Sequence, residues 1–141
     1  MIYIVNGPNL NLLGKREPSI YGKTTLEEIN KKLHKIAEET KEELVFFQNN
    51  SEGSIIDYLQ SLSPHSKVIF NPGALAHTSI ALRDCISGCE LDVIEVHISN
   101  IYNREEFRHH SFISPVCLGT ITGLGINSYI LALNYFLNKD E

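Results

Sequence analysis

The sequence predicts a three-layer α/β sandwich with about five parallel strands. Short apolar runs rich in β-branched and aromatic residues, which are typical of strands, recur along the whole chain. Between them lie amphipathic segments whose apolar residues are three and four positions apart, as in helices. Because strands separated by helices of this length pair in parallel through right-handed crossovers, the alternation points to one parallel sheet covered on both faces.

The individual elements follow from these patterns. Strands are expected at 2–5, 44–47, 68–70, 93–98 and, more weakly, 118–122. Helices are expected at 26–36, 55–62, 80–86 and 126–137. In the last of these, Tyr129 and Leu131 widen the apolar face. The charged stretch 38–43 is expected to be the solvated end of the first helix.

Length and charge narrow the function classes. The 141 residues are enough for one core and too few for two, so we expect a single domain over 1–141. Twelve basic against seventeen acidic residues give a net charge of −5, which argues against a general nucleic-acid binder. No apolar run reaches the roughly 18 residues of a membrane helix. Because MIYIV carries no basic segment or cleavage site, we expect no signal peptide and a cytoplasmic location.

The three cysteines, Cys85, Cys89 and Cys117, form neither a disulfide nor a zinc framework. Cys85 and Cys89 are four apart, which could suggest half a metal site, but no second pair completes it. Free cysteine is a common small core residue. We therefore expect packing roles and no metal site.

The first connection is expected to be the one exceptional connection of the fold. About eighteen residues separate the end of the first strand, near Asn6, from the helix that begins near Thr25, where such loops usually need two to six. A long loop without secondary structure in a compact domain is usually functional. Glycines at 7, 14 and 22 would provide hinges, so we expect an active-site lid at about 14–23.

Polar residues gather where three strands end, which is where open parallel sheets bind ligands. The first strand is followed by NGPN, the third by NPGALAHTS, and the fourth ends in EVHISN. Asparagine and glycine there are also explained by turns and helix caps. Turn chemistry does not explain two histidines and several arginines on the same edge.

The arginines indicate a small anionic ligand. There are four, at 16, 83, 104 and 108, against eight lysines. The planar guanidinium suits carboxylate or phosphate better than lysine does. Arg104 and Arg108 could equally form a surface ion-pair cluster with Glu105 and Glu106, and both interpretations stay open.

Glu95 and His97 are the sharpest candidate pair. At a spacing of two they point to the same side of a strand. A carboxylate within VIEVHI is costly to bury unless it is paired, and it would orient the ring of His97 and favour its protonated form. The alternative is an edge strand whose polar face is merely wet.

Arg16 and Tyr21 lie five apart in the first connection. An adjacent guanidinium stabilises a phenolate and lowers the pKa of a tyrosine, so the two could form a base when the loop closes. Tyr21 could instead serve only as an apolar contact of the lid.

Several blocks closely resemble one family, type II 3-dehydroquinate dehydratase. They are NGPNLNLLG (6–14), REPSIYG (16–22), NPGALAHTSIALRD (71–84), EVHISN (95–100), REEFRHHS (104–111) and GLGINSY (123–129). They appear in the family's order and spacing and cover about residues 1–138. The resemblance implies a flavodoxin-like fold with strand order 2-1-3-4-5.

The resemblance also implies a reaction, the reversible dehydration of 3-dehydroquinate to 3-dehydroshikimate in the shikimate pathway, by anti elimination through an enolate without metal or cofactor. Tyr21 would be the base, and Arg16 would keep it ionised. His97 would be the acid, oriented by Glu95. Asn9 would hold the water that hydrogen-bonds the enolate oxygen.

Substrate contacts are implied in the same way. Asn71, His77 and Arg108 would contact the substrate hydroxyls. Ser99, with the backbone N–H groups of Ile98 and Ser99, would grip the carboxylate. No role is implied for Arg104.

The resemblance implies a homododecamer of four trimers, in which Asp84 reaches the site of a neighbouring subunit.

Three other functions are less consistent with the sequence. Against the type I enzymes, which form a lysine imine, no lysine ends a strand here, and Lys15 and Lys23 lie in the loop. Against a phospho-acceptor module, asparagines stand where acidic residues would be expected. A flavin-binding module would be yellow on purification. Against an inactive structural subunit, every expected catalytic side chain is present.

Overall fold

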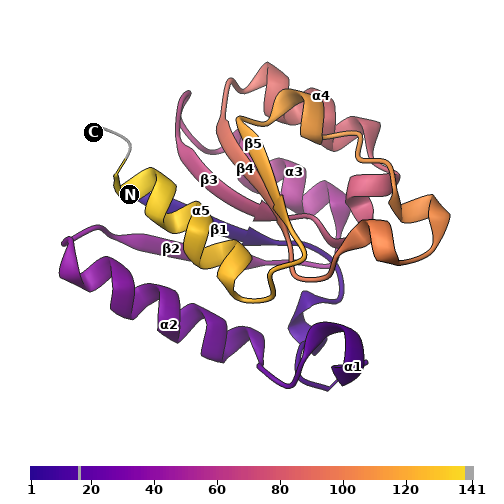
Figure 1. Ribbon diagram of the computed structural model, residues 1–141. Coiled ribbons are helices and arrows are strands. Elements are labelled where there is room, and N and C mark those ends of the chain that lie inside the picture. The colour runs from indigo at the N-terminus through magenta and orange to yellow at the C-terminus, as the bar shows by residue number, and fades with distance from the viewer. Residues whose placement is uncertain (16, 139–141) are drawn as a thin grey trace.

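The sheet has five parallel strands in the order β2-β1-β3-β4-β5 (Figure 1). The computed structural model describes residues 1–15 and 17–138, except for the side chain of Tyr21. The strands are β1 (Ile2–Asn6), β2 (Leu44–Gln48), β3 (Lys67–Asn71), β4 (Asp92–His97) and β5 (Gly119–Thr122). All four neighbouring pairs are parallel. The predicted α/β class, the strand order and the five strand positions are confirmed.

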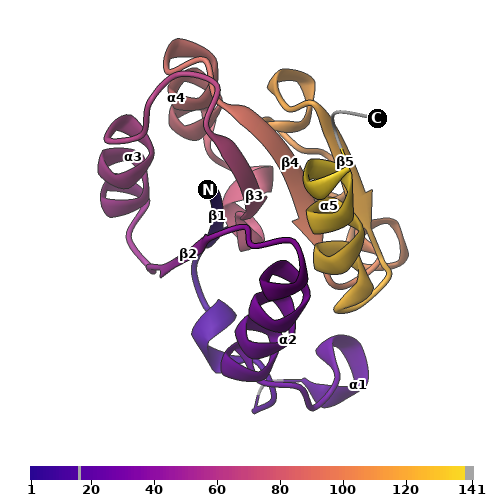
Figure 2. The same ribbon diagram turned by 90° about the vertical axis from the view of Figure 1, so that its left-hand side faces the viewer.

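Helices cover both faces of the sheet (Figure 2). Two apolar clusters fill the spaces between the layers. Helices α2 (Leu26–Glu39) and α5 (Asn127–Leu137) lie on one face, and α3 (Glu52–Gln60) and α4 (Ile80–Gly88) lie on the other. Because successive side chains of a strand point to opposite faces, Ile69 packs under α2 and α5 whereas Val68 and Phe70 pack under α3 and α4.

Side-chain caps set the starts of three helices. Thr25 caps α2 by accepting the backbone N–H of Glu28, and its hydroxyl reaches the Glu28 carboxylate in return. Ser51 caps α3 and Ser79 caps α4 in the same manner. The cap at Ser51 explains why α3 begins three residues before the apolar spacing predicted.

The first connection contains two short helices, so the expectation of a loop without secondary structure was wrong. A 3-10 turn spans Leu10–Leu12, and α1 spans Pro18–Tyr21. Leu10 and Leu13 bury their side chains in the cluster under α2. Proline at the first helical position has the φ that a helix needs, which favours α1 at this point.

The connection between β4 and β5 also departs from the expected pattern. Residues 98–118 form three 3-10 turns, at Ile101–Asn103, Glu106–Arg108 and Ser114–Val116, and no α-helix. Ile101 and Ile113 are buried but twelve positions apart, so no helical apolar stripe is available. The first connection is therefore not the one exceptional connection.

The loops after β1 and β3 touch, and this contact positions the site. A Cβ added at Gly7 would lie 2.5 Å from the carbonyl oxygen of Pro72, so only glycine allows this approach. Gly73 has φ +60°, and its Cβ position faces the carbonyl oxygen of Pro8 at 3.0 Å.

Within the described residues, no helix is long and apolar enough to cross a bilayer.

Candidate active site

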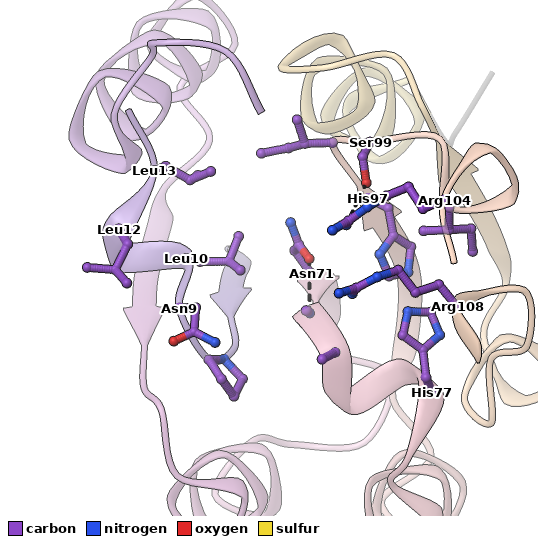
Figure 3. A pocket seen from close by; sticks show the side chains of 15 residues that line it. Asn9, Leu10, Leu12, Leu13, Asn71, His77, His97, Ser99, Arg104 and Arg108 are labelled. Atoms are coloured by element: carbon purple, nitrogen blue, oxygen red, sulfur yellow. Dashed lines mark hydrogen bonds between the residues drawn. The ribbon is translucent and has the colours of Figure 1, made fainter. Parts of the chain in front are cut away.

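A pocket opens at the carboxyl end of the sheet (Figure 3). One wall carries Asn9 and a set of leucines, and the facing wall carries histidines and arginines, with Asn71 between them. Six of the predicted site residues line it with their side chains: Asn9, Asn71, His77, His97, Ser99 and Arg108. Ile98 lines it too. The structure therefore brings residues from three strand ends and the β4–β5 connection to one cavity.

Glu95 and His97 point to the same side of β4, as their spacing predicts. Nε2 of His97 lies 2.5 Å from Oε2 of Glu95. The alternative of a wet edge strand is wrong, because β4 lies between β3 and β5 and Glu95 is 0% exposed. Burial raises the pKa of Glu95, but the hydrogen bond and charge of His97, with two serine hydroxyls, outweigh it, so the net pKa lies below the ordinary value. The lowered pKa favours the ionised carboxylate, which contacts the ring of His97 through this hydrogen bond.

Two serines of the β4–β5 connection complete the surroundings of Glu95. Oγ of Ser111 lies 3.1 and 3.0 Å from the two carboxylate oxygens, and the hydroxyl of Ser114 donates to Oε1. No role for either serine was predicted from the sequence. The available signal was that a buried carboxylate needs more donors than one imidazole supplies.

A buried phenol links the ends of β1 and β3. The hydroxyl of Tyr129 donates to Oδ1 of Asn6 at 2.6 Å and accepts from Nδ2 of Asn71 at 2.8 Å. Burial raises the pKa of Tyr129, so it stays neutral. The expectation that Tyr129 only widens an apolar face was incomplete. The missed signal was a pair of asparagines at the ends of buried strands, because their amides required partners.

His77 lies beside His97, with the ring centroids 6.1 Å apart. Nδ1 of His77 lies 2.7 Å from the backbone oxygen of His110. Burial lowers the pKa of His77, and the charges of His97 and Arg108 act in the same direction, whereas the His110 carbonyl and Glu95 oppose them. The net pKa lies below the ordinary value, which favours a neutral ring at the pocket wall.

Arg104 and Arg108 reach the pocket from the β4–β5 connection, with side chains 10% and 15% exposed. Nη1 of Arg104 lies 3.3 Å from Oγ of Ser99. Nε of Arg108 lies 3.3 Å from each carboxylate oxygen of Glu105. Of the two interpretations left open by the sequence, the ion pairs are present with Glu105, and both arginines also line the cavity. That they bind an anionic ligand stays a prediction.

Among the predicted residues that the structure describes fully, two do not line this pocket: Glu95, which lies against His97, and Asp84. Asp84 is exposed on α4 and does not line it. Arg16 and the side chain of Tyr21 lie outside the described residues. The backbone of Tyr21 ends α1, and other residues of that helix region form a second cleft with Ser99 and Arg104, so α1 lies next to the pocket.

Cys85 is buried, and Cys89 and Cys117 are half-buried; all three are free thiols. Over residues 1–15 and 17–138, no three His, Cys, Asp or Glu side chains are grouped to hold a metal ion.

Comparison with known proteins gives one consistent family. A family model described as "Dehydroquinase class II" matches residues 1–137. The chain is 51% identical over 137 residues to the 3-dehydroquinate dehydratase of Bacillus pumilus, covering 96% of this chain and 93% of that one. It is 55% identical over 133 residues to that of Prochlorococcus marinus, covering 94% and 92%.

Solved structures are similar over the same length. The type II dehydroquinase of Propionibacterium acnes has a TM-score of 0.92 at 41% identity, covering 96% of this chain and 94% of that one. The type II dehydroquinase of Butyrivibrio crossotus has a TM-score of 0.89, also at 41% identity, covering 97% and 96%. The similarity thus includes every strand end that contributes to the pocket.

Proposed function

The chain belongs to the class II dehydroquinase family, a family of hydro-lyases, and we propose on this basis that it dehydrates 3-dehydroquinate reversibly to 3-dehydroshikimate. This reaction places it in the shikimate route to aromatic amino acids. The strongest support for the proposal is the buried Glu95–His97 pair. His97 of this pair lines a pocket that Arg104 and Arg108 also line. An acid beside a cationic pocket suits a substrate that bears both a carboxylate and a leaving hydroxyl.

His97 is the acid in this proposal. Because Nε2 is bonded to Glu95, Nδ1 is the ring nitrogen left to carry a proton toward a ligand. That proton goes to the C1 hydroxyl of the substrate as the C–O bond breaks, so the leaving group departs as water. Glu95 stabilises the protonated imidazole and keeps its ring in place.

Tyr21 is the base, on the strength of the family resemblance. Its phenolate takes the proton alpha to the ketone, and the electron pair of that C–H bond moves to the carbonyl oxygen to form an enolate. Arg16 stabilises the phenolate. Residues 14–23 act as a lid whose closure brings this base over the pocket and excludes water.

The remaining pocket residues hold the substrate. Asn71, His77 and Arg108 contact its hydroxyls, and Ser99 and the backbone N–H groups at 98 and 99 hold its carboxylate. Asn9 holds a water that donates to the enolate oxygen, which lowers the barrier by stabilising charge where it develops. The mechanism uses neither a metal nor another cofactor.

We also propose that the protein assembles as a homododecamer of four trimers in the cytoplasm. Asp84 is exposed on α4, outside its own pocket, which is where a residue that serves a neighbouring site has to lie. Light scattering of the purified protein tests the assembly, and a monomer at micromolar concentration would contradict it.

The direct test of function is turnover of 3-dehydroquinate, followed by the ultraviolet absorbance of the conjugated enone, with and without a chelator. We expect product in both cases. Tyr21→Phe and His97→Ala are expected to lose most of kcat while circular dichroism stays native. Product formation that depends on a metal, or near-normal turnover in either variant, contradicts the mechanism.

Borohydride treatment with substrate provides a second arm. We expect no covalent adduct, because the proposed route passes through an enolate and not a lysine imine. A trapped adduct found by mass spectrometry would favour the imine route.

A further inference from the structure

The hydroxyl of Ser111 can interact with Glu95 only as a hydrogen-bond donor. Its oxygen accepts the backbone N–H groups of Ile113 at 3.3 Å and Ser114 at 3.2 Å. A serine hydroxyl has two acceptor lone pairs and one hydrogen. Since both lone pairs are occupied, the hydrogen is directed at the carboxylate of Glu95, whose oxygens lie 3.1 and 3.0 Å away.

Glu95 receives donors on both oxygens. Ser114 donates to Oε1, Ser111 lies within reach of both oxygens, and Nε2 of His97 lies against Oε2. An ionised carboxylate accepts all of these, whereas a protonated carboxyl could keep them only by donating to Nε2 of a His97 ring that carries its hydrogen on Nδ1. Two serine donors on the carboxylate therefore favour the ionised form.

Neither serine reaches the cavity. The residues that line the pocket include His97 but not Ser111 or Ser114. Both serines come from the β4–β5 connection, behind the side of Glu95 that faces His97. Their side chains contact the acid pair through Glu95.

We propose that Ser111 and Ser114 are positioning residues of the acid machinery, which hold the buried Glu95 carboxylate ionised and aimed at Nε2 of His97. The proposal rests on the dehydratase function proposed above. Burial favours the neutral form of Glu95, and the serine hydroxyls oppose it. Without them Glu95 takes up a proton at higher pH, and a neutral carboxyl stabilises the imidazolium far less.

Other titratable groups near Glu95 do not replace the serines. Apart from His97, the described groups that face it are Cys117 and His77, with Arg108 beyond His77. Burial, and then the charge of Glu95, raise the pKa of the Cys117 thiol to about 12, so it is neutral. His77 is directed at the His110 carbonyl. The two serines are thus the neutral donors that set the ionisation of Glu95 from behind.

The kinetic test uses Ser111→Ala, Ser114→Ala, the double variant, and Ser114→Thr, which keeps the hydroxyl. Ser87→Ala, at an exposed position of α4, is the matched control. The quantity measured is the ratio of variant to wild-type kcat from pH 8 to pH 5, at pH values where circular dichroism is native. The ratio cancels the pH dependence of the base.

For the double variant, we expect the ratio of variant to wild-type kcat to be at least about threefold lower at pH 5 than at pH 8. The reason is that Glu95 of the variant takes up its proton at a higher pH than in wild type. The single variants should show smaller changes in the same direction. Ser114→Thr should recover most of the loss, KM should change little, and the Ser87→Ala ratio should stay at one. A ratio that is reduced equally at every pH marks a merely structural role and overturns the proposal.

A physical measurement separates this proposal from the proposed function. Carboxyl ¹³C NMR of glutamate-labelled protein, with Glu95 assigned from Glu95→Gln, follows the titration directly and needs no turnover. We expect Glu95 to protonate at higher pH in the serine variants than in wild type. An unchanged titration overturns the inference even if the enzyme is active. If wild type does not turn over 3-dehydroquinate, the proposed function fails, and the titration alone decides the role of the serines.

Discussion

The phenol of Tyr129 in α5 and the amide of Asn71 at the end of β3 share a buried hydrogen bond of 2.8 Å. The same phenol donates to Asn6 at the end of β1. One hydroxyl thus satisfies the amides that terminate two adjacent strands. Because Asn71 lines the pocket, a helix on one face of the sheet helps to fix the floor of the site.

The first prediction concerns this link. Tyr129→Phe removes the hydroxyl, so the buried amides of Asn6 and Asn71 each lose this hydrogen-bond partner. We expect the free energy of unfolding to fall by about 1–3 kcal/mol. Tyr135→Phe, at a half-exposed position of the same helix, should change it by less than about 0.5 kcal/mol. Urea denaturation measures both, and equal effects would contradict the role of the hydroxyl.

A second prediction tests the contact between the loops after β1 and β3. Gly7→Ala places a methyl group 2.5 Å from the Pro72 carbonyl oxygen, so the backbone has to shift. We expect a loss of at least about 2 kcal/mol in unfolding free energy. Gly88→Ala, whose new methyl meets nothing within 4 Å, should be neutral or up to about 1 kcal/mol more stable. Thermal and urea unfolding compare the two, and a Gly7→Ala protein as stable as wild type would refute the contact.

The third prediction follows from the lowered pKa of Glu95. A carboxyl whose pKa is lower in the folded than in the unfolded protein stabilises the fold above the unfolded pKa, about 4.3, and this contribution is lost as the pH falls through the folded value. Glu95→Gln should therefore be less stable than wild type by about 2 kcal/mol at pH 7. The gap should close as the medium is acidified below about pH 4. Urea midpoints from pH 7 to pH 3 measure it, and a gap that is independent of pH would contradict the assignment.

The fourth prediction concerns Arg104, whose guanidinium reaches Ser99 at the pocket wall. Arg104→Ala should raise KM for 3-dehydroquinate by about tenfold or more, because a charged donor to an anionic ligand is lost. The KM of Arg104→Lys should lie between those of wild type and Arg104→Ala, since a lysine keeps the charge but not the planar guanidinium group. Lys31→Ala, on the exposed side of α2, is the control. An unchanged KM in Arg104→Ala would remove Arg104 from the binding set.

Much of this arrangement could be predicted from the sequence because it depends on local periodicity. Apolar runs located all five strands, and the spacing of Glu95 and His97 placed both side chains on one side of a strand. The contacts of Ser111 and Ser114 could not be predicted in this way. They depend on how a connection without an α-helix folds back onto β4, and no short-range pattern encodes that path. Tyr129 was misjudged for a related reason, since apolar spacing reports burial but not the partners of a hydroxyl.

The β4–β5 connection has a consequence for how the protein can be altered. Glu95, His97 and both supporting serines lie within residues 95–114, whereas the proposed base belongs to 14–23. The proposed proton donor is therefore encoded by one short segment, 95–114, and the proposed proton acceptor by another, 14–23. Recombination or redesign of residues 14–23 can change the acceptor while the sequence of the donor segment stays the same.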